Sequence, residues 1–139
     1  EAAAANVRVE LIIRGMCSLY PGREGLSESI SVVSIIGQFL EHSRIFWFGN
    51  GGSPEVYIGS ADWMSRNLDR RVEAVTPVED PNLRDRLERL LELYLKDNRG
   101  AWDMQSDGSF IQRQPEDGED VRNSQVQLIK QWSQGVPQS

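Results

Sequence analysis

Cysteine and histidine are nearly absent from this sequence, which contains one of each, Cys17 and His42. A lone cysteine excludes an internal disulfide, and without a second cysteine or a suitably spaced histidine it argues against a structural zinc site. We therefore predict no metal site in this chain and a reducing, cytoplasmic location. A catalytic site with two histidines would need its second one from elsewhere.

Long hydrophobic runs are absent as well. No run approaches the roughly 20 apolar residues that a membrane-spanning helix needs, so we predict no membrane span. The first residues, Glu1 to Ala5, lack the basic start and apolar middle of a signal peptide. They are typical of the end of a helix that begins further upstream, and we expect the sequence to be a fragment of a longer protein.

Positive charge is in deficit, because 15 lysines and arginines face 21 aspartates and glutamates. Such a chain offers no broad footprint for nucleic acid, so we predict no nucleic-acid partner. The balance inverts locally between His42 and Arg71. That stretch holds Arg44, Arg66, Arg70 and Arg71 against Glu55, Asp62 and Asp69. A polyanionic ligand would have to bind this local patch.

Short apolar runs alternate with turns along the chain. Its 139 residues, with 39% hydrophobic content, are enough to form one core. The runs predict strands at residues 7–13, 44–48, 56–59 and 71–75. The run 44–48 is apolar on both faces, which favours an interior strand, whereas residues 32–36 could be strand or helix. We predict an α/β fold with a mixed, mostly parallel sheet flanked by helices.

Two helices are expected in the body of the chain. Apolar residues at helical spacing favour a short helix over residues 34–41, which would place His42 at its C-terminal end. Asp80 and Pro81 form a typical helix start, and an apolar stripe continues from there to Leu95.

Beyond residue 100 the pattern weakens. Residues 102–111 predict a small hairpin and residues 114–120 a polar linker, followed by a candidate terminal helix over residues 121–132. No internal repeat occurs. We therefore predict one domain over residues 1–112 and a polar tail, made of the linker and the candidate helix, over residues 113–139.

The chemistry of the chain centres on His42 and Arg44. Two positions apart on a strand, their side chains would share one face and could hold the same phosphate. Downstream, Ser60 and Asp62 offer a hydroxyl and a carboxylate that could orient the imidazole. The arrangement resembles the phospholipase D superfamily, which combines a histidine and a lysine with a later Gly-Ser-x-Asn step. Here Arg44 stands in the place of the lysine and Asp62 in the place of the asparagine.

Each of these residues also has a structural interpretation. Judged alone, a single histidine is more often a structural group than a catalytic one. Arg66 and Arg70 are best explained as part of a solvated surface. Aromatic residues at strand spacing usually pack, so we predict Phe46, Trp47 and Trp63 in the core.

Four longer motifs carry a closer resemblance. They are Leu11–Leu19 (LIIRGMCSL), Phe39–Arg44 (FLEHSR), Asn50–Gly52 (NGG) and Ser60–Glu73 (SADWMSRNLDRRVE). From about Val7 to Phe110 the chain resembles the C-terminal domain of bacterial polyphosphate kinase, with the polar end after Gln112 outside the similarity. The resemblance implies a phospholipase D-like fold. It also implies a kinase that reversibly transfers the terminal phosphate of ATP to inorganic polyphosphate through a phosphohistidine.

The same resemblance implies roles for individual residues. Arg14, His42 and Arg71 would bind the phosphates of ATP, and His42 would also serve as the acid opposite the phosphohistidine. Apart from the resemblance, the chemistry of arginine makes Arg44 a further candidate to clamp phosphate oxygens. The phosphohistidine itself is implied to lie in a preceding domain that this sequence does not contain, so we expect the fragment to be inactive alone.

The resemblance further implies partners and cofactors. ATP and inorganic polyphosphate would be the substrates, and upstream domains of the same chain would complete the site. Mg²⁺ is implied for the whole enzyme, with ligands expected mostly upstream, and a homo-oligomer is expected for the whole enzyme. We predict a cytoplasmic enzyme, with membrane association of the whole enzyme left open.

Two other functions stay open at this stage. One is half of a phospholipase D-type phosphodiesterase or nuclease, which would need no nucleotide, although the substitutions at Arg44 and Asp62 argue against it. The other is a noncatalytic phosphate-binding or assembly module.

Overall fold

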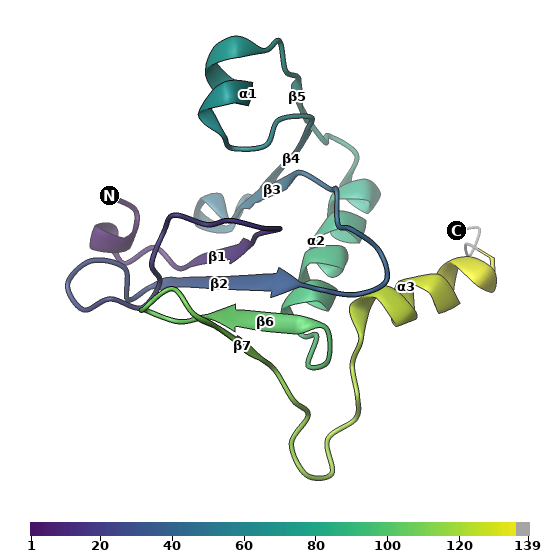
Figure 1. The fold of residues 1–139 in the computed structure, drawn as a ribbon. Coiled ribbons are helices and arrows are strands. Elements are labelled where there is room, and N and C mark those ends of the chain that lie inside the picture. Colours follow the sequence, from purple (N-terminus) through teal and green to yellow (C-terminus); the bar gives the residue numbers. More distant parts are fainter. Residues whose placement is uncertain (136–139) are drawn as a thin grey trace. The chain divides into compact units, whose positions relative to one another are not determined.

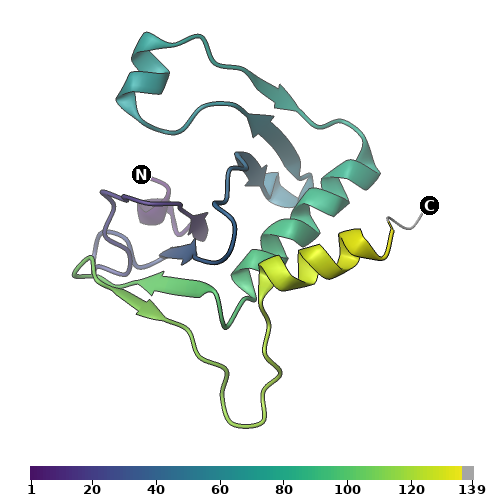
Figure 2. The same cartoon turned by 45° about the vertical axis from the view of Figure 1, so that its right-hand side comes forward.

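The computed structural model describes residues 1–135, which fall into two compact units. The first unit combines Glu1–Glu41 with Leu93–Ser139, and the second is His42–Glu92. Figure 1 and Figure 2 show the elements of both units from two directions. The last residues of the predicted polar tail, 136–139, lie outside the described part of the chain.

The first unit is built on a four-stranded sheet with the order β1-β2-β6-β7 (Figure 1). Its elements are the 3-10 turn η1 (Ala3–Ala5), β1 (Val9–Ile12), β2 (Ile30–Ile35), β6 (Ala101–Met104), β7 (Phe110–Gln112) and α3 (Ser124–Ser133). β1 pairs with β2 in parallel, whereas the β2–β6 and β6–β7 pairs are antiparallel. The predicted hairpin around Gly108 is therefore confirmed, with this glycine at a φ of +90° in the turn.

The core of the first unit forms around β2. This strand is rich in β-branched residues, which suit a pleated surface, and Val32 and Val33 on its opposite faces are 2% and 3% exposed. The helix predicted over residues 34–41 is wrong, because the strand continues to Ile35 and residues 36–44 form neither helix nor strand. Most of the apolar side chains that suggested helical spacing are exposed, so no buried face supports a helix there.

The second unit contains a three-stranded antiparallel sheet with the order β3-β4-β5. Its elements are β3 (Ile45–Phe48), the 3-10 turn η2 (Asn50–Gly52), β4 (Glu55–Gly59), α1 (Ser65–Arg70), β5 (Val75–Pro77) and most of α2 (Pro81–Leu95). β3 and β4 confirm two predicted strands. However, β3 is an edge strand rather than an interior one, and Trp47 and Phe48 on it are 40% and 52% exposed.

The prediction of a mostly parallel sheet is also wrong. Among the described strands only the β1–β2 pair is parallel, and the other four pairs are antiparallel. The chain therefore has a mixed α/β fold with two sheets and few helices. Short connections such as the η2 turn explain the difference, because antiparallel strands can be joined by a tight turn and parallel strands need a long crossover.

The connection between β4 and β5 differs from the prediction. It contains α1, which the sequence pattern did not indicate, and the strand predicted at residues 71–75 begins only at Val75. Within α1 only Asn67 is buried, so the helix lacks the apolar stripe by which helices are found. The prediction of a core position is wrong for Trp47, which is exposed on β3, and for Trp63, which is 76% exposed and stacks on Phe46 with 5.6 Å between the ring centroids.

Both long helices begin at capping side chains. The carboxylate of Asp80 accepts a hydrogen bond from the N–H of Leu83 at 3.0 Å, which confirms the predicted start of α2. The side chain of Asn123 accepts one from the N–H of Val126, also at 3.0 Å, at the start of α3. Neither these helices nor α1 is long and apolar enough to cross a membrane.

The first residues of α3 are buried and hydrogen-bonded to the rest of the first unit. Ser124 bonds to Asp97, and Gln125 bonds to Phe39. These contacts join the polar end of the chain to residues before residue 112. The division of the chain into domains at that residue stays a prediction.

Candidate active site

The segment between β2 and β3 carries His42 and Arg44. This segment is irregular, and β3 begins only at Ile45. The prediction that the two side chains lie on one face of a strand is therefore wrong. The two side chains nevertheless meet directly. The carbonyl of Arg44 also accepts a hydrogen bond from the N–H of Gly59 at 2.9 Å, which ties this segment to the end of β4.

The guanidinium of Arg44 lies between His42 and Asp62. Its Nη1 is 2.7 Å from Nδ1 of His42 and donates to the His42 carbonyl at 2.7 Å. Its Nη2 donates to Oδ1 of Asp62 at 2.8 Å, in an ion pair whose side chains are 15% and 30% exposed. Because the planar guanidinium presents several donors in a fixed fork, one arginine can hold the histidine and the aspartate together.

This geometry selects a form of the His42 ring. A guanidinium only donates hydrogen bonds, so Nδ1 of His42 must accept, and in the neutral ring the proton then sits on Nε2. Nε2 is 3.4 Å from the same arginine nitrogen, a longer contact. His42 is exposed, so its Nε2–H can donate a hydrogen bond to an anionic oxygen that arrives from outside.

Ser60 does not orient the imidazole, contrary to the sequence-based expectation. Its hydroxyl donates to a carboxylate oxygen of Glu73 at 2.5 Å and accepts from the N–H of Ala74 at 3.1 Å. A hydroxyl has one proton to donate, and that proton is used here. The carboxylate of Asp62 acts on His42 through Arg44.

Arg14 follows β1 in the first unit and is half-buried. Its Nη1 donates to the carbonyl oxygen of Glu41 at 2.6 Å. Glu41 immediately precedes His42, so Arg14 is connected to the histidine through a single peptide group.

Arg71 lies at the C-terminal end of α1 in the second unit and is exposed. Arg66 and Arg70, on α1 itself, are exposed as well. Within the described residues Arg71 forms no hydrogen bond or ion pair with His42 or Arg44. Within the second unit the structure therefore brings His42, Arg44 and Asp62 into one cluster and leaves Arg71 at the end of α1, whereas Arg14 belongs to the first unit and bonds to Glu41.

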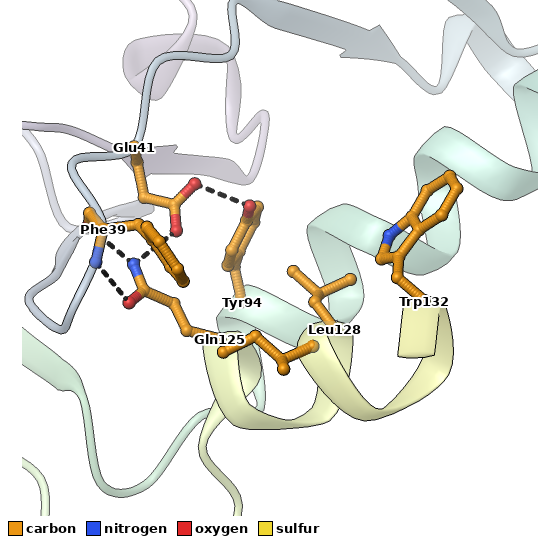
Figure 3. Close-up of a pocket in the computed structure, with 7 residues that line it drawn as sticks. Phe39, Glu41, Tyr94, Gln125, Leu128 and Trp132 are labelled. Carbon is orange, nitrogen blue, oxygen red and sulfur yellow. Dashed lines mark hydrogen bonds between the residues drawn. The ribbon is translucent and has the colours of Figure 1, made fainter. Parts of the chain in front are cut away.

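Three residues of the first unit were given no role by sequence reasoning. Glu41, Tyr94 and Gln125 lie in a hollow of the first unit with a volume of about 410 Å³ (Figure 3). Its other lining residues are Phe39, Leu128, Ile129 and Trp132. Burial, and then the hydrogen bond to the Glu41 carboxylate, raise the pKa of the Tyr94 hydroxyl. Tyr94 belongs to the apolar stripe that predicted α2, and Gln125 lies in the candidate terminal helix, where nothing in the sequence pattern marked it.

Metal-ligating side chains are scattered over the chain. Within residues 1–135 no group of three or more histidine, cysteine, aspartate or glutamate side chains lies close enough together to hold a metal ion.

Comparison with known families identifies the domain. The family described as "Polyphosphate kinase C-terminal domain 2" matches residues 1–125. The chain belongs to this family. The resemblance found in the motifs is therefore confirmed, and the match continues past Phe110, where that resemblance was expected to end.

Relatives of this polyphosphate kinase domain are much longer proteins. The chain is 99% identical to "Polyphosphate kinase" of Parasynechococcus marenigrum over all 139 residues, and 69% identical to that of Prochlorococcus marinus over 99% of its length. It covers 20% and 19% of these two relatives. The chain thus spans about a fifth of the curated relatives that it matches.

A solved structure agrees with the fold. The crystal structure of polyphosphate kinase from Porphyromonas gingivalis matches with a TM-score of 0.89 at 40% sequence identity. The match covers 96% of this chain and 20% of that one.

Proposed function

We propose that this chain supplies one half of the active site of an ATP:polyphosphate phosphotransferase. In the proposed reaction the terminal phosphate of ATP moves reversibly to inorganic polyphosphate through a phosphohistidine in an upstream domain. The observation that carries the proposal is the bond from Arg44 to Nδ1 of His42, which leaves the Nε2–H of an exposed ring available to a phosphate oxygen. Membership of the family supports it.

His42 is the proposed catalytic residue. Phosphoryl transfer requires the protein mainly to position the groups and to stabilise the charge that develops on the oxygens. A hydrogen bond from Nε2 to the leaving or attacking phosphate oxygen would do both. Arg44 holds the ring in this orientation, and its own contact with phosphate stays a prediction.

Arg14 and Arg71 are the proposed phosphate-binding residues. Arginine suits this role because its fork gives paired hydrogen bonds to phosphate and keeps its charge at all relevant pH values. Arg14 follows β1, and its Nη1 donates to the Glu41 carbonyl at 2.6 Å. Arg71 is exposed at the end of a helix that carries two further arginines.

The wider assignments follow from the same proposal. The fold would be phospholipase D-like, the enzyme cytoplasmic, and the complete protein a homo-oligomer with its upstream domains packed around this one. Mg²⁺ would serve the whole enzyme. The described residues offer no fitting ligand cluster for it. A phospholipase D-type hydrolase is disfavoured because Asp62, in the place of the asparagine, forms an ion pair with Arg44.

A titration followed by NMR tests the phosphate site, since His42 is the one histidine of the chain. The purified chain would be titrated with ATP and, separately, with polyphosphate while the ring resonances are recorded. We expect saturable shifts that are weakened by Arg14→Ala and by Arg71→Ala, but not by Arg66→Ala. Unchanged resonances at millimolar concentrations of both ligands would contradict a preformed phosphate site in this domain.

A further inference from the structure

The hollow of the first unit is built mainly from one face of α3 (Figure 3). Four of its seven lining residues, Gln125, Leu128, Ile129 and Trp132, recur at the spacing that brings side chains to the same side of a helix. Phe39, in the segment after β2, lines it as well. All of its lining residues belong to the first unit, so the hollow is a feature of that unit alone.

The polar groups of the hollow are already bonded to one another. The two carboxylate oxygens of Glu41 accept from the hydroxyl of Tyr94 and from Nε2 of Gln125, at 2.7 Å each. The Gln125 amide also accepts from the N–H of Phe39 at 2.9 Å and donates to its carbonyl at 2.7 Å. These bonds use the hydroxyl proton and both amide protons, and a carboxylate repels phosphate. The hollow therefore suits an apolar occupant better than a nucleotide.

The apolar side chains of the hollow are open to solvent. Phe39 is 55% exposed, Ile129 43% and Trp132 59%. Isolated exposed apolar residues are common on protein surfaces, but several that gather around one hollow are typical of an interaction site. We call Phe39, Leu128, Ile129 and Trp132 the docking face.

We propose that the docking face binds an apolar segment from the upstream part of the same polypeptide. The chain covers 20% and 19% of the two polyphosphate kinases named above, and its family is described as a C-terminal domain, so most of the remaining length is expected to precede it. A tethered segment acts at an effective concentration on the order of 1 mM, which favours it over a second copy. The inference rests on the proposed function only in taking the complete enzyme to carry upstream domains.

The test places the photoreactive residue p-benzoylphenylalanine at position 39 of the complete enzyme. The probe replaces one aromatic side chain by another, and Gln125 holds the backbone there at both the N–H and the carbonyl. Irradiation should cross-link it, within one polypeptide, to a peptide that precedes residue 1, which mass spectrometry identifies. The same probe in place of Lys130, an exposed residue of α3 that does not line the hollow, is the control and should not give this product.

Ile129→Asp tests the same face with the probe still at position 39. If the docking face is covered, the substitution buries an unpaired carboxylate, and the yield of the cross-link should fall roughly tenfold or more. If the face is uncovered, the new charge stays in water and the yield should not change. Lys130→Asp introduces the same side chain beside the hollow and should leave the yield unchanged. An unchanged yield with Ile129→Asp would overturn the proposal.

Other products identify other occupants, and each of them would overturn the proposal. A product of twice the mass on a denaturing gel would show that a second copy binds the docking face. A cross-link to residues 42–92 would show that the second unit covers it, and no product above the Lys130 control would show that it stays in solvent. None of these readouts depends on turnover. Wild-type turnover of His42→Ala would instead contradict the proposed function and leave the docking face standing.

Discussion

Asp97 and Ser124 form a buried pair that joins α3 to the start of β6. Both the N–H and the hydroxyl of Ser124 donate to Oδ2 of Asp97, at 2.7 Å each. Oδ1 of Asp97 accepts three backbone N–H groups at 2.6 to 3.2 Å, from Arg99, Gly100 and Ala101. The aspartate is 1% exposed and the serine fully buried. One carboxylate therefore organises both the turn before β6 and the first turn of α3.

Asp97→Asn should destabilise the chain strongly. Asparagine has one carbonyl oxygen and one NH₂ group in place of the two carboxylate oxygens. In either orientation of the amide, the NH₂ group faces donors that now bond to a carboxylate oxygen, and these donors are left unpaired in a buried site. We expect the free energy of unfolding to fall by about 3 kcal/mol, measured by denaturant titration at pH 7. Asp117→Asn, at an exposed position, is the control. Equal stability of the two variants would contradict this account of Asp97.

The same carboxylate should make stability depend on acid. Burial by itself would raise the pKa of Asp97, but the hydrogen bonds from Ser124, Arg99 and Gly100 outweigh it and the pKa lies below the ordinary value. A carboxyl group whose pKa is lowered by folding stabilises the folded state at pH values above its unfolded pKa, about 3.9. This contribution is lost as the pH falls through the folded pKa. The stability difference between wild type and Asp97→Asn should therefore shrink below about pH 4. A constant difference from pH 7 to pH 2 would be inconsistent with this.

Arg44→Lys should impair the enzyme although it keeps the charge. Lysine offers a point charge instead of a planar fork and cannot bond His42 and Asp62 in the observed geometry. We expect kcat of the complete enzyme to fall roughly tenfold, as for a misplaced catalytic group. Arg66→Lys, at an exposed position of α1, should have no effect. Wild-type kcat for Arg44→Lys would show that the ring is not held by the fork.

Arg71→Ala should weaken nucleotide binding more than Arg66→Ala or Arg70→Ala. All three side chains are exposed, but only Arg71 is proposed to bind phosphate. A charge-assisted hydrogen bond contributes about 1.5 to 3 kcal/mol, so the dissociation constant for ATP should rise roughly tenfold or more. Calorimetry on the complete enzyme would measure it. Similar losses for all three variants would indicate a diffuse electrostatic effect instead.

The sequence predicted the elements that have local signals. Asp80 before Pro81 marked the start of α2 because capping is a local interaction, and the glycine-rich turn before residue 55 marked the β3–β4 hairpin. The run 32–36 carried no local signal that could decide between strand and helix. These residues form a strand because β2 pairs with β6, which follows about 70 residues later in the chain.

The candidate site was only partly predictable for the same reason. His42, Arg44 and Arg14 lie in recognisable motifs, whereas Gln125 contacts Glu41, a residue 84 positions earlier in the chain. Neither its residue type nor its polar surroundings mark it in the sequence. Asp62 was identified, but its partner was not, because the fold places Arg44 between the carboxylate and the imidazole.

The most direct test of the account is the turnover of the complete enzyme with His42→Ala, compared with Ser43→Ala at the exposed neighbouring position. Loss of a group that donates to the transferring phosphate should lower ATP-dependent polyphosphate synthesis by roughly 100-fold or more in a folded protein with unchanged Tm. Ser43→Ala should retain wild-type turnover. Near-normal synthesis by a well-folded His42→Ala enzyme would contradict the claim that this domain contributes a catalytic histidine.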